Sequence, residues 1–188
     1  MHINRFDIAN VAEIIPARRD DYRGYFSETF RADWFAQNVS DAKFVQDNQS
    51  LSRAVGTVRG LHFQTVPAVQ GKLVRCLAGS VMDYAVDIRH GSPTFGQWLG
   101  VRLSAGDGNQ LWVPGGFAHG FCTLEPDSII AYKVTSYYSA ENDAGVAWDD
   151  PVIGIEWPDV VDPDQLSAKD KVQPRLADLP AYFPFGEY

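Results

Sequence analysis

The middle of the chain is a succession of short runs rich in β-branched and aromatic residues, each bounded by turn-forming residues. The candidate strands are residues 57–63, 72–78, 80–88, 97–103, 110–113, 118–123 and 128–137. Helical patterns are scarce and short, at residues 31–36 and 164–170. Many short strands without alternating helices favour an all-β jelly roll of about eight antiparallel strands over any layered α/β fold.

Length and charge narrow the class of protein. The 188 residues are enough for one sizeable core, so we expect a single domain over residues 1–188. A formal charge of −8 argues against a surface that neutralises nucleic acid. The chain has no apolar run long enough to span a bilayer and no signal-like start, which predicts a cytoplasmic protein with no membrane partner.

Cys76 and Cys122 lie in apolar runs without CxxC spacing, and we expect buried free thiols.

Two of the four histidines, His62 and His119, fall in strand-like runs among other functional residue types. A histidine of near-neutral pKa suits general base catalysis, provided that a carboxylate orients it and a cation stabilises any oxyanion. Lys72 is the candidate cation. Asp83, Asp87 and Asp170 are candidate orienting carboxylates, which the sequence cannot rank.

A metal site is the first alternative, because jelly rolls often hold a metal with several histidines and a carboxylate. The usual metal-binding cupin pattern begins His-x-His. Here the pattern is His62-Phe63-Gln64, and Gln70 stands at a plausible third position where a glutamate would be expected. Neutral amides make a poor metal site, so we expect no metal.

Two tyrosines are candidate functional residues: Tyr132 within the run 128–137 and Tyr138 directly after it. Strand side chains alternate, so Tyr132 and Tyr138 share one face and lie roughly 20 Å apart, about the length of an extended nucleotide sugar. One phenol would then reach a reacting sugar while the other stacks on a base. The alternative is that both are aromatics of the barrel wall.

Several ordered segments together resemble one family. They are residues 44–50, 59–64, 71–75, 87–89, 92–98, 114–120, 132–138, 154–158 and 166–170. In these segments the chain resembles the dTDP-4-dehydrorhamnose 3,5-epimerases, cupin enzymes of dTDP-rhamnose synthesis. The resemblance implies a cupin jelly roll in which His62 is the base, Asp170 orients it, Tyr132 is the acid and Lys72 lies near the C4 keto oxygen. It implies no metal or other cofactor, because the ketone of the substrate acidifies C3 and C5.

The resemblance also implies a binding site for the dTDP-sugar substrate. Its members are Arg23, Phe26, Glu28, Gln46, Asp47, Asn48, Arg59, His119, Tyr138, Asp143 and Lys169. Tyr138 would stack on thymine, and Asp143 stands where the family often has Glu. The family pattern further implies a homodimer to which the segment of about residues 1–50 contributes, with Arg23, Phe26 and Glu28 serving the neighbouring site. The segment of about residues 159–188 would pack outside the barrel.

Three other functions remain open from the sequence. A related enzyme could epimerise only C3 or only C5. A metal-dependent cupin enzyme is disfavoured by Gln64. A non-catalytic nucleotide-sugar binding module would keep the arginines and tolerate loss of His62 or Tyr132.

Overall fold

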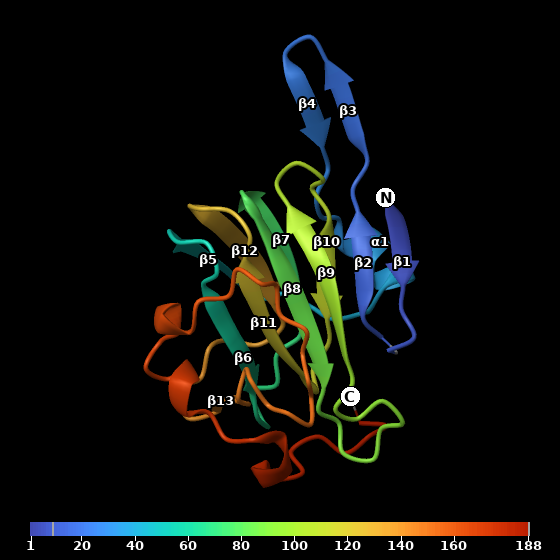
Figure 1. The fold of residues 1–188 in the computed structure, drawn as a ribbon. Coiled ribbons are helices and arrows are strands. Elements are labelled where there is room, and N and C mark those ends of the chain that lie inside the picture. The colour runs from blue at the N-terminus through green and yellow to red at the C-terminus, as the bar shows by residue number, and fades with distance from the viewer. Residues whose placement is uncertain (9, 188) are drawn as a thin grey trace.

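Two antiparallel sheets lie face to face in the computed structural model, which describes residues 1–8 and 10–187 (Figure 1). The larger sheet contains, in spatial order, β1 (His2–Arg5), β2 (Ala12–Ile15), β10 (Gln110–Val113), β7 (Lys72–Ala78), β12 (Ser128–Val134) and β5 (Gln46–Ser52). The smaller sheet contains β13 (Asp143–Gly145), β6 (Val58–Gln64), β11 (Phe117–Thr123), β8 (Ser80–Asp87) and β9 (Trp98–Ser104). This is the all-β jelly roll that the strand pattern predicts.

The core between the two sheets is formed by side chains that alternate along each strand. It includes Val74 of β7, Ala85 of β8, Leu111 of β10, Phe121 of β11 and Ile130 of β12, all buried. Burial of this apolar surface drives the sheets together, at about 25 cal/mol per Å² removed from water. The polar groups of the site lie at one end of this core.

Short helices and irregular segments cover the outer faces. Helix α1 (Ala32–Asn38) packs Phe35 against Trp112 on the outer face of the larger sheet. The 3₁₀ helices η1 (Pro163–Gln165), η2 (Asp170–Val172) and η3 (Leu176–Asp178) belong to the C-terminal segment. Leu176 and Phe183 of that segment pack with β6 and β8 residues on the outer face of the smaller sheet. The described part of the chain contains no helix long and apolar enough to cross a membrane.

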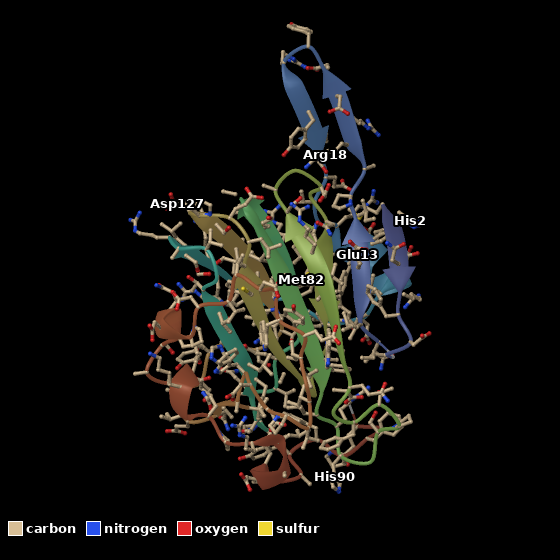
Figure 2. All side chains as sticks on the ribbon, viewed as in Figure 1. His2, Glu13, Arg18, Met82, His90 and Asp127 are labelled. Carbon is tan, nitrogen blue, oxygen red and sulfur yellow. The ribbon has the colours of Figure 1, made fainter. Side chains whose placement is uncertain are left out.

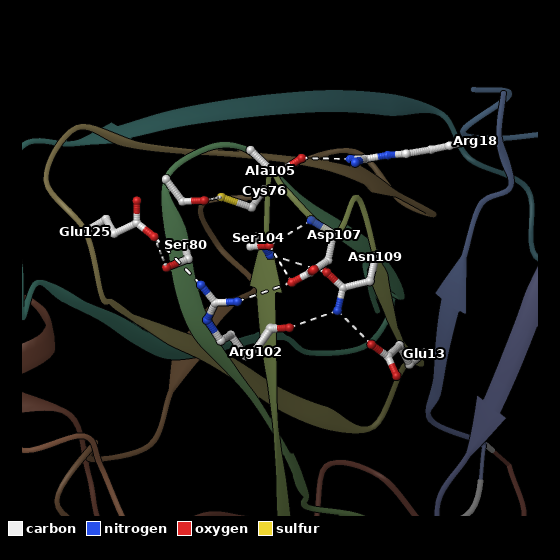
Figure 3. Close-up of polar contacts among 11 residues, drawn as sticks. Glu13, Arg18, Cys76, Ser80, Arg102, Ser104, Ala105, Asp107, Asn109 and Glu125 are labelled. Carbon is white, nitrogen blue, oxygen red and sulfur yellow. Dashed lines mark hydrogen bonds and ion pairs between the residues drawn. The ribbon is translucent and has the colours of Figure 1, made fainter. Parts of the chain in front are cut away.

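A hairpin of β3 (Arg18–Asp21) and β4 (Gly24–Ser27) projects from the body (Figure 1). Its side chains stand clear of the two sheets in Figure 2, and Tyr22 is 96% exposed. Only its base is tied down. The Arg18 guanidinium donates to the Ala105 carbonyl at 2.9 Å, in the turn between β9 and β10 (Figure 3), and Gln110 donates to the Thr29 carbonyl at 2.6 Å. We call residues 18–27 the arm.

The predicted strands of the middle region are confirmed, with small shifts at their ends. Two expectations were wrong. The two sheets hold more strands than about eight, because β1, β2, β5 and β13 are short, polar or both and were not recognised. Strand β5 reads QDNQSLS and pairs with β12 at a sheet edge. The run 128–137 ends as a strand at Val134, because Gln70 donates a side-chain hydrogen bond to the Ser136 carbonyl beyond it.

Candidate active site

A cavity of about 470 Å³ opens between the two sheets and the C-terminal segment. It brings together most of the residues that the sequence assigns to chemistry. Its lining residues are Ser50, Thr57, Val58, Arg59, His62, Lys72, His119, Phe121, Tyr132, Gln165, Ser167, Lys169 and Asp170. A concave site with converging polar groups is the usual form of a ligand or active site.

The partner of His62 is Asp170, which settles the choice among the three candidate aspartates. His62 Nε2 lies 2.5 Å from Asp170 Oδ1, across 108 residues of sequence. Burial raises the pKa of Asp170, but hydrogen bonds from His62 and Ser167 outweigh burial and hold the pKa below its usual range. An ionised Asp170 accepts the proton on Nε2, so Nδ1 is the ring nitrogen that can take a proton from a substrate. The His62 side chain is 32% exposed and therefore accessible from the cavity.

Two glycines place His62 directly beside His119. These histidines pair across β6 and β11, and the register shifts immediately afterwards, between His119 and Phe121. A Cβ atom on Gly60 would lie 2.6 Å from the Gly120 Cα, which is closer than real Cβ contacts allow. Gly60 also has a φ of +140°, a conformation that residues with a side chain rarely adopt. The two strands can approach here only because both positions are glycine.

His119 has an aspartate of its own. Its Nε2 lies 2.8 Å from Asp83 Oδ1 on the neighbouring strand β8, and both side chains are buried. Burial lowers the pKa of His119, and Asp83 opposes that effect only in part. The ring of His119 is therefore suited to a neutral, fixed hydrogen-bonding role. The third candidate aspartate, Asp87, lies elsewhere and accepts from Arg89, Ser92 and Thr94.

Lys72 is a buried cation at the start of β7. It is 8% exposed, and its Nζ donates to the His62 carbonyl at 3.1 Å. Burial lowers the pKa of Lys72 to about 8, while the negative charges of Asp83 and Asp143 act in the opposite direction. At neutral pH the ammonium keeps two further donors for an oxygen in the cavity.

Tyr132 enters the cavity from β12 in the opposite sheet. The strands that carry Tyr132 and His62 belong to different sheets, so the phenol and the imidazole approach the cavity from different sides. Burial raises the pKa of Tyr132, and the charge of Arg59 opposes this only in part. Tyr132 therefore keeps its proton at neutral pH, as an acid must.

Cations and a carboxylate surround the cavity mouth. Arg59 is braced by bonds to the Ser52 hydroxyl at 2.9 Å and to the Leu51 carbonyl at 3.1 Å. Asp143 accepts from Lys169 at 2.5 Å and from the Tyr138 hydroxyl at 3.1 Å. A positively charged mouth of this kind suits an anionic ligand in an otherwise acidic protein.

Tyr138 is held by glutamines rather than by a strand. Gln64 donates to the Ala68 and Tyr137 carbonyls and accepts from the Ser139 amide at 2.8 Å. Gln46 accepts from the Tyr138 amide at 3.1 Å. The spacing of Tyr132 and Tyr138 along one strand face is therefore wrong, because the chain leaves the sheet after Val134. Tyr138 remains 61% exposed at the mouth.

Gln64 and Gln70, which stand at ligand positions of the metal-binding cupin pattern, both hydrogen-bond the backbone. Gln64 stands where a metal-binding cupin has histidine, and both ends of its amide are engaged by the backbone. Gln70 donates to the Ser136 carbonyl at 2.7 Å. Among residues 1–8 and 10–187, no group of three or more His, Cys, Asp and Glu side chains is arranged to hold a metal ion. The two cysteines are free and buried, as expected.

Gln46, Asp47 and Asn48 of β5 are outside the lining of this cavity. Asp47 pairs with Lys133 at 2.9 Å, and Asn48 accepts from Gln46 at 2.8 Å. Asp47 and Asn48 line a second cavity of about 260 Å³, which shares Tyr132 with the first.

The structure does not bring the arm residues to the cavity of their own chain. Arg23 is at the tip of the arm, where it pairs with Asp21, and Phe26 is 69% exposed. Glu28 follows β4 and is also outside the cavity lining. If Arg23, Phe26 and Glu28 contact a substrate, that substrate is bound by another subunit.

Comparison with known proteins agrees with this geometry. A family model described as dTDP-4-dehydrorhamnose 3,5-epimerase matches residues 5–178. The chain belongs to the dTDP-4-dehydrorhamnose 3,5-epimerase family. A relative of that name from Sinorhizobium fredii is 56% identical over 185 residues, which cover 98% of this chain and 94% of the relative.

Solved structures of 3,5-epimerases share the fold. The dTDP-6-deoxy-D-glucose-3,5-epimerase of Legionella pneumophila, solved in complex with dTDP-4-keto-L-rhamnose, has a TM-score of 0.91 and 43% identity, with 97% of both chains covered. A double mutant of ChmJ, a 3′-monoepimerase from Streptomyces bikiniensis, was solved in complex with dTDP. Its TM-score is 0.90 at 31% identity, and the match covers 98% of this chain and 93% of ChmJ. Enzymes that invert one centre thus share the epimerase fold with those that invert two.

Sequence reasoning missed some residues that shape the site. Ser167 accepts from the Asp170 amide at 3.1 Å and so fixes the turn that presents the carboxylate. Gln165 lines the cavity from η1. Asp83 was recognised only as a possible partner of His62. The register of β8 and β11 makes Asp83 the partner of His119, and residue types alone do not predict that register.

Proposed function

We propose that this chain epimerises dTDP-4-dehydro-6-deoxy-D-glucose at C3 and C5, which gives dTDP-4-dehydro-L-rhamnose. The observation that carries the proposal is the pairing of His62 with Asp170 in a cavity that also receives Tyr132 and Lys72. Epimerisation needs a base on one face of a sugar ring and an acid on the other. The two sheets supply one of each.

The proposed chemistry follows from the C4 ketone of the substrate. His62 Nδ1 removes the proton from C5 or C3, the electron pair of the broken C–H bond forms a double bond to C4, and the π pair of the C4 carbonyl moves onto its oxygen. Lys72 stabilises the resulting enolate through its ammonium. Tyr132 then donates its proton to the same carbon from the opposite face, and the carbonyl re-forms. Proton exchange with solvent restores His62 and Tyr132 before the second centre reacts. Each positioned acid or base contributes ~10²–10⁴-fold in rate.

The nucleotide would occupy the charged mouth of the cavity. Arg59 and His119, which line the cavity, would contact the phosphates and sugar, and the exposed Tyr138 would stack on thymine. Lys169 and Asp143 would contact the sugar or the nucleotide at the same rim. Gln46, Asp47 and Asn48 support this rim from β5.

The proposed active form is a homodimer in which the arm of each copy reaches the site of the other. The support is the exposure of aromatic residues on an arm that is anchored only at its base: Tyr22, Tyr25 and Phe26 are 96%, 59% and 69% exposed. Arg23 and Glu28 would then complete the neighbouring site. The pattern of an anchored base and a free apolar tip is what a partner-binding segment requires.

The activity is tested by incubating the purified protein with dTDP-4-keto-6-deoxyglucose in D₂O and following C3 and C5 by NMR. We expect deuterium at both carbons and a product of L-rhamno configuration. Label at one carbon would assign the chain to single-centre epimerisation, the second candidate that the likeness to ChmJ favours. Label at neither carbon would refute the proposed epimerase activity and would favour a non-catalytic nucleotide-sugar binding module.

Arm exchange is tested by mixing two inactive variants. Arg23→Ala damages the arm and His62→Ala damages the base, so each homodimer should be inactive or strongly impaired. In a mixed dimer, the intact base of the first variant is served by the intact arm of the second. Random exchange at a 1:1 ratio makes about half of the dimers mixed, each with one of its two sites restored, so we expect up to about one quarter of the wild-type activity. If mixing restores nothing, the arm serves its own chain or no site.

A further inference from the structure

Asp83 is a buried carboxylate behind the active-site cavity, where it bonds His119, one of the lining residues. It lies on β8 and is 0% exposed. Val81 and Ala85, two residues away on either side, share its face of the strand and belong to the apolar core between the sheets. A carboxylate in such surroundings costs several kcal/mol unless charges or hydrogen bonds compensate for the lost water.

Only half of this carboxylate is used for hydrogen bonding. Oδ1 accepts from His119 Nε2 at 2.8 Å, while Oδ2 is fully buried and has no hydrogen-bond partner among the described residues. The single bond to a neutral imidazole does not compensate for the buried charge. A nearby cation is needed, and the cation is Lys72, on which Asp83 exerts the largest opposing charge.

Titratable groups from several elements lie around Lys72. Those that line its cavity are Arg59 and His62 of β6, His119 of β11, Tyr132 of β12, and Lys169 and Asp170 of the C-terminal segment. The charges of Asp83 of β8, Asp143 of β13 and Lys169 act on it. Asp143 is already engaged by Lys169, and Asp170 by His62. Asp83 is therefore the buried negative charge that remains for Lys72.

We propose that Asp83 is a positioning residue for the epimerase reaction, which keeps Lys72 protonated in a buried site and holds His119 in one tautomer. The inference rests on the proposed function, because it concerns the cation that stabilises the enolate. Without the carboxylate charge of Asp83, Asp143 is the remaining charge that opposes burial, and the ammonium loses its proton at a lower pH. Asp83 need not touch the substrate to have this effect.

Asp83→Asn removes the charge and preserves the shape. In the pH profile of kcat/KM, we expect the alkaline limb of the variant to move down by roughly one pH unit. The acid limb should stay in place, because His62 and Asp170 are unchanged. The rate at neutral pH should fall by roughly twofold and the rate well above pH 8 by roughly tenfold, whereas the Kd for dTDP should remain within about twofold. An unshifted alkaline limb, or an equal loss of rate at every pH, would overturn the inference.

Two further measurements separate this role from a structural one. His119→Leu removes the hydrogen-bond donor to Asp83 but keeps the charge of Asp83, so its alkaline limb should coincide with that of the wild type. An equal shift in this variant would contradict a role for the Asp83 charge. If Asp83→Asn does not fold, the protonation state of Lys72 is measured in the wild type by NMR titration of ¹³C-labelled lysine. The Lys72 signal is assigned as the one that is missing from the spectrum of Lys72→Arg. A neutral Lys72 at pH 7 would overturn the inference.

A wild-type protein without epimerase activity would refute the proposed function and would be recognised before any variant is compared. An active wild type with an unshifted Asp83→Asn profile would refute only the role of Asp83.

Discussion

His62 and His119 lie opposite each other on β6 and β11, and each bonds a different aspartate. The two pairs differ in exposure: the His62 side chain is 32% exposed and the His119 side chain 9%. The exposed imidazole can exchange protons with a ligand and with solvent. The buried one is fixed on Asp83. One fold thus places a base and a positioned neutral imidazole side by side.

Asp170→Asn should reduce kcat by ~10²-fold or more, because an amide no longer fixes the His62 tautomer that leaves Nδ1 free. Binding of dTDP should change little, since Asp170 contacts His62 rather than the nucleotide in our account. Steady-state kinetics and calorimetry measure the two effects separately. Ser167→Ala, which removes only the hydroxyl that supports Asp170, is the graded control and should cost much less activity.

Tyr132→Phe should separate proton removal from inversion. His62 can still take a proton from the sugar and return it to the same face, so deuterium should enter the substrate from D₂O while the product of inverted configuration is lost. NMR of recovered substrate measures both. Tyr182→Phe, outside the cavity lining, is the matched control. Full inversion by Tyr132→Phe would remove Tyr132 from the role of acid.

The activity should fall on the alkaline side as Lys72 loses its proton. Burial lowers the pKa of Lys72 to about 8, so the ammonium is present below that pH and is lost above it. Tyr132 ionises later, because burial raises its pKa. A profile of kcat/KM against pH should therefore bend downward near pH 8. Lys72→Met should lower the rate by ~10²–10³-fold and abolish the bend; a bend that persists would assign it to another group.

Asp87→Asn should destabilise the fold by roughly 3–5 kcal/mol, because it removes the carboxylate charge beside the buried Arg89 guanidinium. Burial raises the pKa of Asp87, but hydrogen bonds from Arg89, Ser92 and Thr94 outweigh burial and lower it. The stability from this carboxylate is thus present at neutral pH and lost as the pH falls through its folded pKa. Urea unfolding measures the change.

Asp33→Asn is the control for that experiment. Asp33 pairs with Arg31 at 2.7 Å, but both side chains are exposed, at 58% and 59%. Exposed pairs contribute little, so the unfolding midpoint should not move measurably. An effect of Asp87→Asn as small as that of Asp33→Asn would show that the Asp87 cluster is dispensable.

The strands of the barrel could be predicted from sequence because their buried faces require β-branched and aromatic residues. The missed strand β5 is polar since it lies at the edge of its sheet, with alternate residues exposed. The end of β12 was misjudged for another reason. Its termination depends on Gln64 and Gln70, which act from distant positions in the chain.

The sequence predicts which types of residue carry the chemistry of the site, and the family resemblance implies roles for most of them. The pairing of aspartates with histidines was not predictable from residue types. Asp83 and Asp170 are equally plausible partners of a strand histidine until the register of β8 and β11 and the path of the C-terminal segment are known. The placement of Arg23 and Phe26 away from the cavity likewise depends on the arm projecting from the body.

The central claim is that His62 removes the proton at both carbons. Its most direct test compares deuterium entry at C3 and C5 for the wild type and for His62→Asn, with dTDP binding measured in parallel. We expect exchange at both carbons in the wild type, loss of exchange at both in the variant, and unchanged binding. Exchange at either carbon that survives the loss of His62 would contradict the account.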